Sequence, residues 1–189
     1  MKQHAMKSDI ENHVNGIDMD VLMETINAVK EDSELGVCRF RASNQCVSGT
    51  HNRSRITGYY AARQEIAHLQ TFELDADEPP ILAGEDIGAN PVEYLLSALA
   101  SCLTTSIVAH AAVRGMRIDA IESTLEGDLN LNGFFGLDET VAKGFTNITV
   151  NFKVKSDEDI ATLLELSKFS PVFGTLTQGV NVNVNMESM

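Results

Sequence analysis

The chain has 189 residues, of which 43% are hydrophobic and 22% charged, and its formal net charge at pH 7 is −13 with histidine neutral. These are the proportions of an ordinary globular protein and exclude bulk disorder. So acidic a chain also excludes general binding to nucleic acid or to anionic membranes, which needs a basic field. The three cysteines, Cys38, Cys46 and Cys102, are too few for a disulfide framework and lack the spacing of a zinc site.

The N-terminal residues contain no apolar segment followed by a small-residue cleavage site, so we expect no signal peptide. Together with the free thiols, this favours the cytoplasm. Residues 17–30 have the periodicity of an amphipathic helix, with Asp18 placed to cap it. From 37 to 74 the pattern is typical of strands, with Cys38 and Cys46 at the parity of core positions, and an acidic loop follows at 75–80.

Asn90-Pro91 opens the longest predicted helix, which runs to Arg114 and ends at Gly115. Glu93 stands at the third helical position, where it completes a capping box with Asn90. Residues 94–113 have the length of a membrane span and carry no Lys, Arg, Asp or Glu, but six of them are Ser, Thr or His. This composition favours a helix buried inside a soluble protein over a helix in lipid.

Two alternating runs, at 121–131 and 148–154, predict further strands. Ser156 is expected to cap a helix that reaches about residue 169, Pro171 interrupts it, and Val180 to Met186 alternate as a last strand. Strands and helices segregated in this way indicate an α+β fold. The sequence contains no nucleotide-binding glycine motif, no G-x-S-x-G and no H-E-x-x-H.

Cys102 lies in the middle of the long helix, on a face of mostly small and apolar residues. Cysteine is among the residues most often buried, and a thiol buried without a cationic neighbour is inert. A reactive thiolate needs a cation that the fold brings close to it. The sequence nominates these candidates: Arg39, Arg41, Arg53, Arg55, Arg63 and Arg114.

Residues 77–103 carry a specific pattern, in which an acidic loop leads into Asn90-Pro91, an apolar helix follows, and Cys102 stands eleven residues after the proline. In this the chain resembles the OsmC/Ohr family, the osmotically induced and organic-hydroperoxide-resistance proteins. Residues 169–172, Phe-Ser-Pro-Val, are similar to the second motif of that family. The resemblance divides the chain into an N-terminal extension, 1–35, and an OsmC-like domain, 36–189.

The resemblance implies an intertwined homodimer of α+β subunits, with antiparallel sheets around a long buried central helix. It also implies thiol-dependent reduction of organic or inorganic hydroperoxides, with no metal, haem or other cofactor. Cys102 matches the peroxidatic cysteine of the family. The arginine that holds its thiolate lies in the N-terminal strands of the family, where Arg53 is the best match and Arg55 the second.

Two positions depart from the family pattern. Ser170 replaces the second cysteine and cannot form a disulfide, so the sulfenic acid must be resolved by Cys38 or Cys46, or by an external thiol or dithiol. The glutamate that directly follows Asn-Pro in many members is Val92 here. Glu93 is the adjacent carboxylate, and we retain it as a candidate catalytic residue beside its capping interpretation.

Two functions of different classes follow from these residues. The first is a cysteine-based peroxidase for oxidative-stress defence, which uses Cys102, Arg53 and Glu93 and takes a hydroperoxide and an external reductant as partners. The second is a non-catalytic OsmC-like dimer that binds a small apolar ligand or serves a stress role, with Cys102 only lining the pocket. Neither function involves nucleic acid or a membrane.

Overall fold

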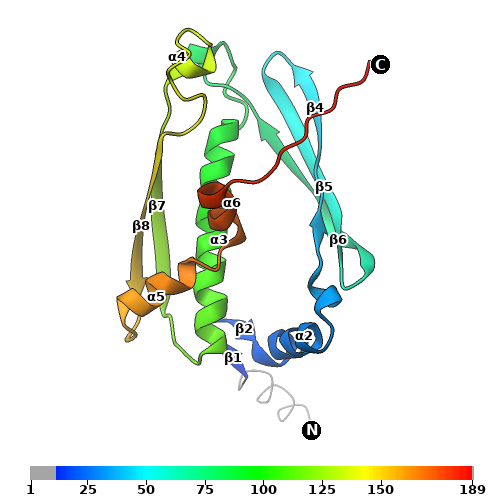
Figure 1. Ribbon diagram of the computed structural model, residues 1–189, viewed down its shortest axis with the longest axis vertical. Coiled ribbons are helices and arrows are strands. Elements are labelled where there is room, and N and C mark those ends of the chain that lie inside the picture. Colours follow the sequence, from blue (N-terminus) through cyan, green and yellow to red (C-terminus); the bar gives the residue numbers. More distant parts are fainter. Residues whose placement is uncertain (1–11, 189) are drawn as a thin grey trace. The chain divides into compact units, whose positions relative to one another are not determined.

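The computed structural model describes residues 12–188 of the chain (Figure 1). Two compact units make up the chain. Of the described residues, the first unit contains 12–13 and Asp18–Leu95, and the second contains Val14–Ile17 and 96–188. Residues 1–11 of the predicted extension lie outside the described part.

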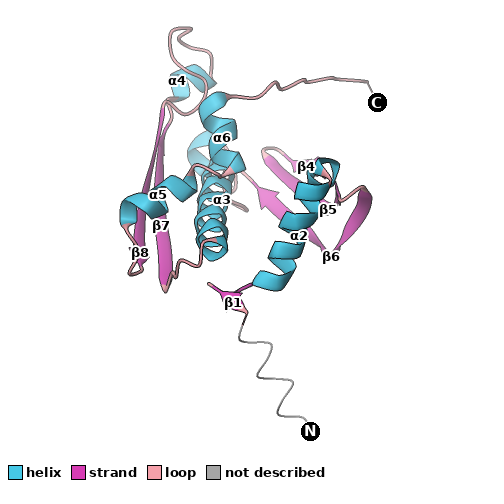
Figure 2. Cartoon of the chain, turned by 60° about the horizontal axis from the view of Figure 1, so that its bottom comes forward, coloured by secondary structure: helices cyan, strands magenta, loops and turns pink. Residues whose placement is uncertain are grey.

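The first unit begins with a helix, α2 (Met19–Glu31), and a short 3-10 turn, η1 (Ser33–Gly36) (Figure 2). The Asp18 side chain accepts hydrogen bonds from the backbone N–H groups of Asp20 and Val21, which would otherwise lack partners at a helix start. The amphipathic helix and its cap are therefore confirmed.

An antiparallel sheet forms the rest of the first unit. Its strands are β3 (Arg39–Phe40), β4 (Ser43–Ser48), β5 (His51–Ala61) and β6 (Gln64–Ala76). The long strand β5 pairs with β3 and β4 along one edge and with β6 along the other. The strand β6 extends through Asp75 and Ala76, where the sequence predicted a loop, because these residues pair with Arg53 and Asn52 of β5.

The second unit contains most of a long helix, α3 (Pro91–Val113), and an antiparallel pair, β7 (Ala120–Asp128) and β8 (Asn147–Lys155). Three shorter helices follow the strands, namely α4 (Leu131–Phe134), α5 (Ile160–Ser167) and α6 (Pro171–Gln178). A small hairpin, β1 (His13–Val14) and β2 (Ile17–Asp18), precedes α2. Its Asn15 side chain donates to the Met116 carbonyl and accepts from the Ile118 N–H.

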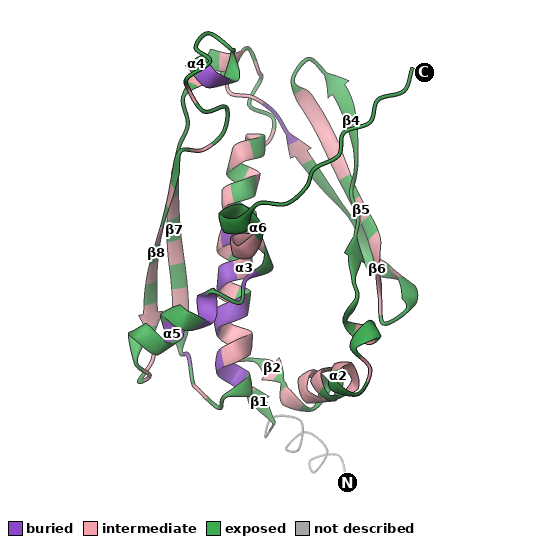
Figure 3. Cartoon of the chain, viewed as in Figure 1, coloured by how far each residue is buried: buried purple, intermediate pink, exposed green. Residues whose placement is uncertain are grey.

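The core of the second unit lies between α3 and α5 (Figure 3). Its buried members are Ile107, Ala111, Ile118, Leu163 and Leu166. By length and composition α3 could cross a membrane, but one stripe of it, from Leu99 to Ala112, is buried in this protein core. The prediction of a core helix is thus confirmed for that stripe, while positions such as Leu95 and Val113 are exposed.

Two local predictions are wrong. The helix α5 is capped by Asp159, whose carboxylate accepts from the Thr162 N–H, while the Ser156 hydroxyl donates instead to the Arg117 carbonyl. The segment Val180 to Met186 forms no strand. A strand needs a partner for its N–H and C=O groups, and no described backbone group pairs with this segment.

Candidate active site

Arg53, the arginine nominated from the sequence, projects from β5 and is held by Asp75 of the neighbouring strand β6. The Arg53 Nε donates to Asp75 Oδ1 at 2.8 Å, and a terminal nitrogen donates to Oδ2 at 3.2 Å. This two-point contact fixes the plane of the guanidinium. The hydrogen bonds from Arg53 and then from His51 lower the pKa of Asp75, so its carboxylate stays ionised. The Arg53 side chain remains 40% exposed, so it can meet a further anion.

His51 shares the same carboxylate. Its Nε2 lies 2.8 Å from Asp75 Oδ1, the oxygen that also accepts from Arg53 Nε, and its side chain is only 12% exposed. An ionised carboxylate only accepts hydrogen bonds, so Nε2 must carry the proton. One carboxylate oxygen therefore binds two donors from β5, and we call His51, Arg53 and Asp75 the charge cluster.

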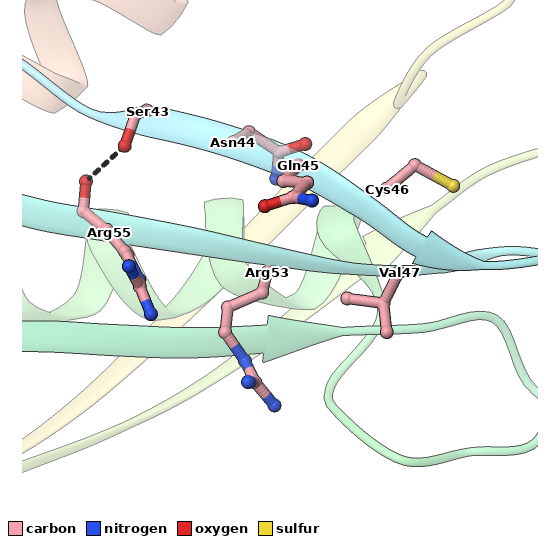
Figure 4. A pocket seen from close by; sticks show the side chains of 7 residues that line it. All are labelled: Ser43, Asn44, Gln45, Cys46, Val47, Arg53 and Arg55. Atoms are coloured by element: carbon pink, nitrogen blue, oxygen red, sulfur yellow. Dashed lines mark hydrogen bonds between the residues drawn. The ribbon is translucent and has the colours of Figure 1, made fainter.

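Arg55, the second candidate, forms an equivalent ion pair two residues further along β5. It contacts Glu73 at 2.8 Å, and Arg55 and Glu73 are register partners as Arg53 and Asp75 are. Both arginines line a pocket formed by residues of β4 and β5 (Figure 4). Figure 4 shows Arg53, Arg55 and Val47 pointing to the same side, while Cys46 points to the opposite side.

The loop after β6 is organised around Asp77, whose carboxylate is almost fully buried. It accepts from the Thr50 hydroxyl at 2.6 Å and from the backbone N–H groups of Glu78, Glu85 and Ile87. The Thr50 hydrogen bond, followed by the backbone donors, lowers the pKa of Asp77 to about 2. Because Thr50 precedes His51, the same carboxylate ties the loop to the start of β5.

Glu93 acts as a cap in this structure. Its Oε2 accepts from the Asn90 N–H at 2.9 Å, while the Asn90 side chain accepts from the Val92 N–H. The structure thus forms the predicted capping box, whereas the catalytic role of Glu93 stays a prediction. One residue further along the chain, the Tyr94 hydroxyl donates to the Asp75 carbonyl at 2.7 Å. This hydrogen bond joins the start of α3 to β6, whose Asp75 side chain binds Arg53.

Cys102 lies on α3 in the second unit, while Arg53 and Glu93 belong to the first. Its thiol is free and half-buried. Cys38 and Cys46 are also free, and both are exposed, so the prediction that they pack in a core is wrong for the single chain. Alternation identified two faces of the strand, but every residue of β4 is exposed.

Ser170, at the position of the second family cysteine, is buried and caps α6. Its hydroxyl oxygen accepts from the Phe173 N–H at 3.2 Å, and Pro171 occupies the first turn. Serine is a strong N-cap, so this side chain has a structural role of its own. Just before it, the Phe169 ring stacks on His110 of α3 with ring centroids 4.1 Å apart.

Comparison with known proteins places the chain in a family. Residues 84–185 match a family model described as OsmC-like protein. The chain belongs to the OsmC-like family. No curated protein matches the sequence.

Solved OsmC-like structures share the α+β fold of antiparallel sheets and one long helix. An OsmC-like protein from Mycoplasma pneumoniae is 20% identical with a TM-score of 0.55, over 78% of this chain and 94% of that one. An osmotic stress induced and detoxification response protein from Psychrobacter arcticus is 14% identical with a TM-score of 0.52, over 69% and 83%. The organic hydroperoxide resistance protein OsmC from Legionella pneumophila is 16% identical with a TM-score of 0.50, over 73% and 90%.

The OsmC-like match begins at residue 84, so the charge cluster lies outside it, and sequence reasoning missed two of its members. The acidic stretch before two prolines predicts a loop at Asp75, whereas the structure places Asp75 in β6. The residues 49–55 have a turn-like composition, which predicts a turn at His51, whereas the structure places His51 at the start of β5. The available signal was parity, since His51, Arg53 and Arg55 alternate on one face of the same strand.

Proposed function

We propose that the protein is a thiol-dependent hydroperoxide reductase with Cys102 as its nucleophile. Membership of the OsmC-like family supports this, and one solved neighbour is named as an organic hydroperoxide resistance protein. The observation that carries the proposal is the state of Arg53, which is oriented by Asp75 at two points and still 40% exposed. A fixed, accessible guanidinium is the group that stabilises a thiolate and the charge leaving on a peroxide oxygen.

The reaction balances without a metal or cofactor. The Cys102 thiolate attacks one oxygen of the hydroperoxide R–O–O–H, the O–O bond breaks, and the alkoxide takes a proton to leave as the alcohol R–OH. The sulfur is oxidised to the sulfenic acid, Cys–S–OH, and the peroxide is reduced. Arg53 would stabilise the negative charge that develops on the leaving oxygen.

An external thiol completes the cycle in this proposal, because Ser170 cannot resolve the sulfenic acid. The first reductant thiol condenses with Cys–S–OH to give a mixed disulfide and water. A second thiol then releases the Cys102 thiol and leaves with the disulfide of the reductant. Such a cycle suits a reducing compartment, which is consistent with a cytoplasmic protein.

We also propose that the protein works as a homodimer. Large apolar side chains stand exposed on the single chain, including Leu69, Phe40, Val182 and Val184, and a partner would bury them. A second copy is the partner that the family resemblance favours.

Intact mass measurement after one equivalent of an organic hydroperoxide, with a sulfenic-acid trap, tests the proposal. We expect one trapped adduct per chain in the wild type and in the double variant Cys38→Ser/Cys46→Ser, and none in Cys102→Ser. A folded wild-type protein without modification at Cys102 would overturn the proposal and favour the non-catalytic dimer that binds a small apolar ligand. A disulfide between Cys102 and Cys38 or Cys46 would show instead that the cysteine is resolved internally.

A further inference from the structure

We propose that His51 is a positioning residue that sets the charge of the Arg53 site according to pH. The inference rests on the proposed function, since it assigns a role to a residue beside the proposed active-site arginine. The geometry that carries it is the shared oxygen, because Asp75 Oδ1 accepts from both His51 Nε2 and Arg53 Nε at 2.8 Å. Any change in the charge of His51 therefore acts on the same atom that orients Arg53.

The hydrogen bond from His51 persists in both protonation states. In neutral imidazole the single proton lies on Nε2, where Asp75 accepts it, and protonation adds a second proton at Nδ1. The arrangement of the cluster is thus kept while its charge changes. With neutral His51 the cluster sums to zero, and with the imidazolium it carries one positive charge.

The surrounding groups leave this change uncompensated. On the same face, Arg55 and Glu73 form a closed pair of opposite charges. On β4, Ser48 stands opposite His51. The next acid, Asp77, has its carboxylate occupied by Thr50 and three backbone N–H groups, so it stays ionised and constant through the pH range in which histidines titrate.

The consequence is a site that attracts anions more strongly at lower pH. When His51 is charged, two cations share the Asp75 carboxylate, and less of the Arg53 charge is neutralised. The thiolate of Cys102 and the peroxide oxygens are the anionic groups of the proposed reaction. We therefore expect the reactivity of the thiolate, at a fixed thiolate fraction, to rise about threefold to tenfold as His51 becomes charged.

The substitution His51→Gln tests this directly, because glutamine keeps an N–H donor for Asp75 and cannot titrate. We expect the second-order rate of Cys102 oxidation, corrected for the thiolate fraction measured at each pH between about 5 and 8, to show a step in the wild type and none in His51→Gln. The matched control is His68→Gln on β6, whose ring packs between Tyr59 and Phe72 and should leave the step in place. A step that survives in His51→Gln would overturn the proposal.

A second readout needs no activity. In an NMR titration of the wild type, the Arg53 Nε–H resonance should shift with the same midpoint as the His51 ring, and it should stay flat in His51→Gln. An Arg53 resonance that does not follow His51 would refute the coupling. A protein that shows the coupled shift but no reaction with hydroperoxide would contradict the proposed function alone.

Discussion

At the scale of residues, the first unit contains two similar ion pairs whose roles can be compared by mutation. Two arginine–carboxylate pairs stand side by side on one face of β5 and β6, Arg53 with Asp75 and Arg55 with Glu73. They share strand, face and chemistry, but only Asp75 also accepts from a histidine. Variants of the two pairs should therefore separate a specific role in the reaction from a general effect of surface charge.

Replacing Arg53 by glutamine should reduce kcat/KM for an organic hydroperoxide by about 100-fold, the usual effect of losing one donor to a developing oxyanion. Arg55→Gln removes the same charge from the neighbouring position and should change kcat/KM by less than about threefold. Steady-state kinetics with a dithiol reductant measures both. Equal losses in the two variants would contradict the assignment of Arg53.

Asp75→Asn should reduce kcat/KM about tenfold, because the amide cannot accept from both Arg53 nitrogens and orients the guanidinium less firmly. The loss should fall mainly on kcat, since the arginine remains present for binding, and Asp75→Glu should recover part of it. Glu73→Asn, the change on the matched pair, should leave kcat unchanged. If Asp75→Asn raised KM alone, the carboxylate would contribute to binding rather than to positioning.

The residues of the site could be predicted from sequence only in part. Arg53 could be nominated because it lies in the strand region where the family resemblance expects an arginine. Its partner could not, because the pairing of Arg53 with Asp75 depends on the register of β5 against β6 across 22 residues of sequence. Cys46 shows the same limit, since alternation predicts which residues share a face but not whether that face is covered.

At the scale of elements, the loop between β6 and α3 is the most constrained part of the first unit. Asp77 closes it with four hydrogen bonds, and an added Cβ at Gly88 would lie 2.1 Å from the Asp75 carbonyl oxygen. Ala83 and Asp86 adopt left-handed backbone conformations, which are strained for alanine and tolerated by aspartate. The loop thus fixes the end of β6, and with it Asp75, relative to the first turn of α3.

The Asp77→Asn variant should melt several degrees below the wild type at pH 7, because the amide cannot accept all four hydrogen bonds. The pKa of Asp77 is lowered to about 2 by the fold, so its contribution is present above its ordinary pKa and is lost as pH falls through about 2. The two melting curves should therefore converge near that pH. Circular dichroism between pH 2 and 7 measures this. Asp86→Asn in the same loop is the control and should melt like the wild type, since asparagine tolerates its left-handed backbone.

Ser170→Ala should destabilise the protein by about 1 kcal/mol, because it removes the acceptor for the Phe173 N–H at the start of α6. Chemical denaturation measures the change. Thr175→Ala removes an exposed hydroxyl within the same helix, one that only donates back to the Pro171 carbonyl, and should cost less. If Ser170→Ala were neutral, the serine would have no capping role, and its place in the family motif would need another explanation.

At the scale of the whole molecule, the structure differs most from the sequence-based prediction in the C-terminal segment, where a predicted strand does not form. The alternation of apolar and polar residues from Val180 to Met186 is as regular as that of β7 and β8. Those two strands form as predicted, because each supplies hydrogen-bond partners to the other. The C-terminal segment has the side-chain pattern, but no backbone group among residues 12–188 pairs with it. The sequence of a segment encodes its tendency to form a strand, whereas pairing also requires a second strand beside it.

A second copy of the chain would supply that partner, and the segment offers a matched test of the proposed homodimer. Val182 and Val184 are 77% and 82% exposed. In the sequence they alternate with Asn181 and Asn183, which a strand would present on its opposite side. Val182→Lys/Val184→Lys should weaken dimerisation roughly tenfold or more, since each valine loses the free energy of its burial in the dimer. Asn181→Lys/Asn183→Lys adds the same charge on the polar side and should remain dimeric.

Light scattering after size-exclusion chromatography across a range of protein concentrations distinguishes these outcomes. Both double variants add two positive charges to a chain of net charge −13, so a general electrostatic effect would move them together. Dissociation of the valine variant alone would assign the apolar side of this segment to the interface. A monomeric wild type would contradict the homodimer, and equal dimerisation in all three proteins would exclude the C-terminal segment from the interface.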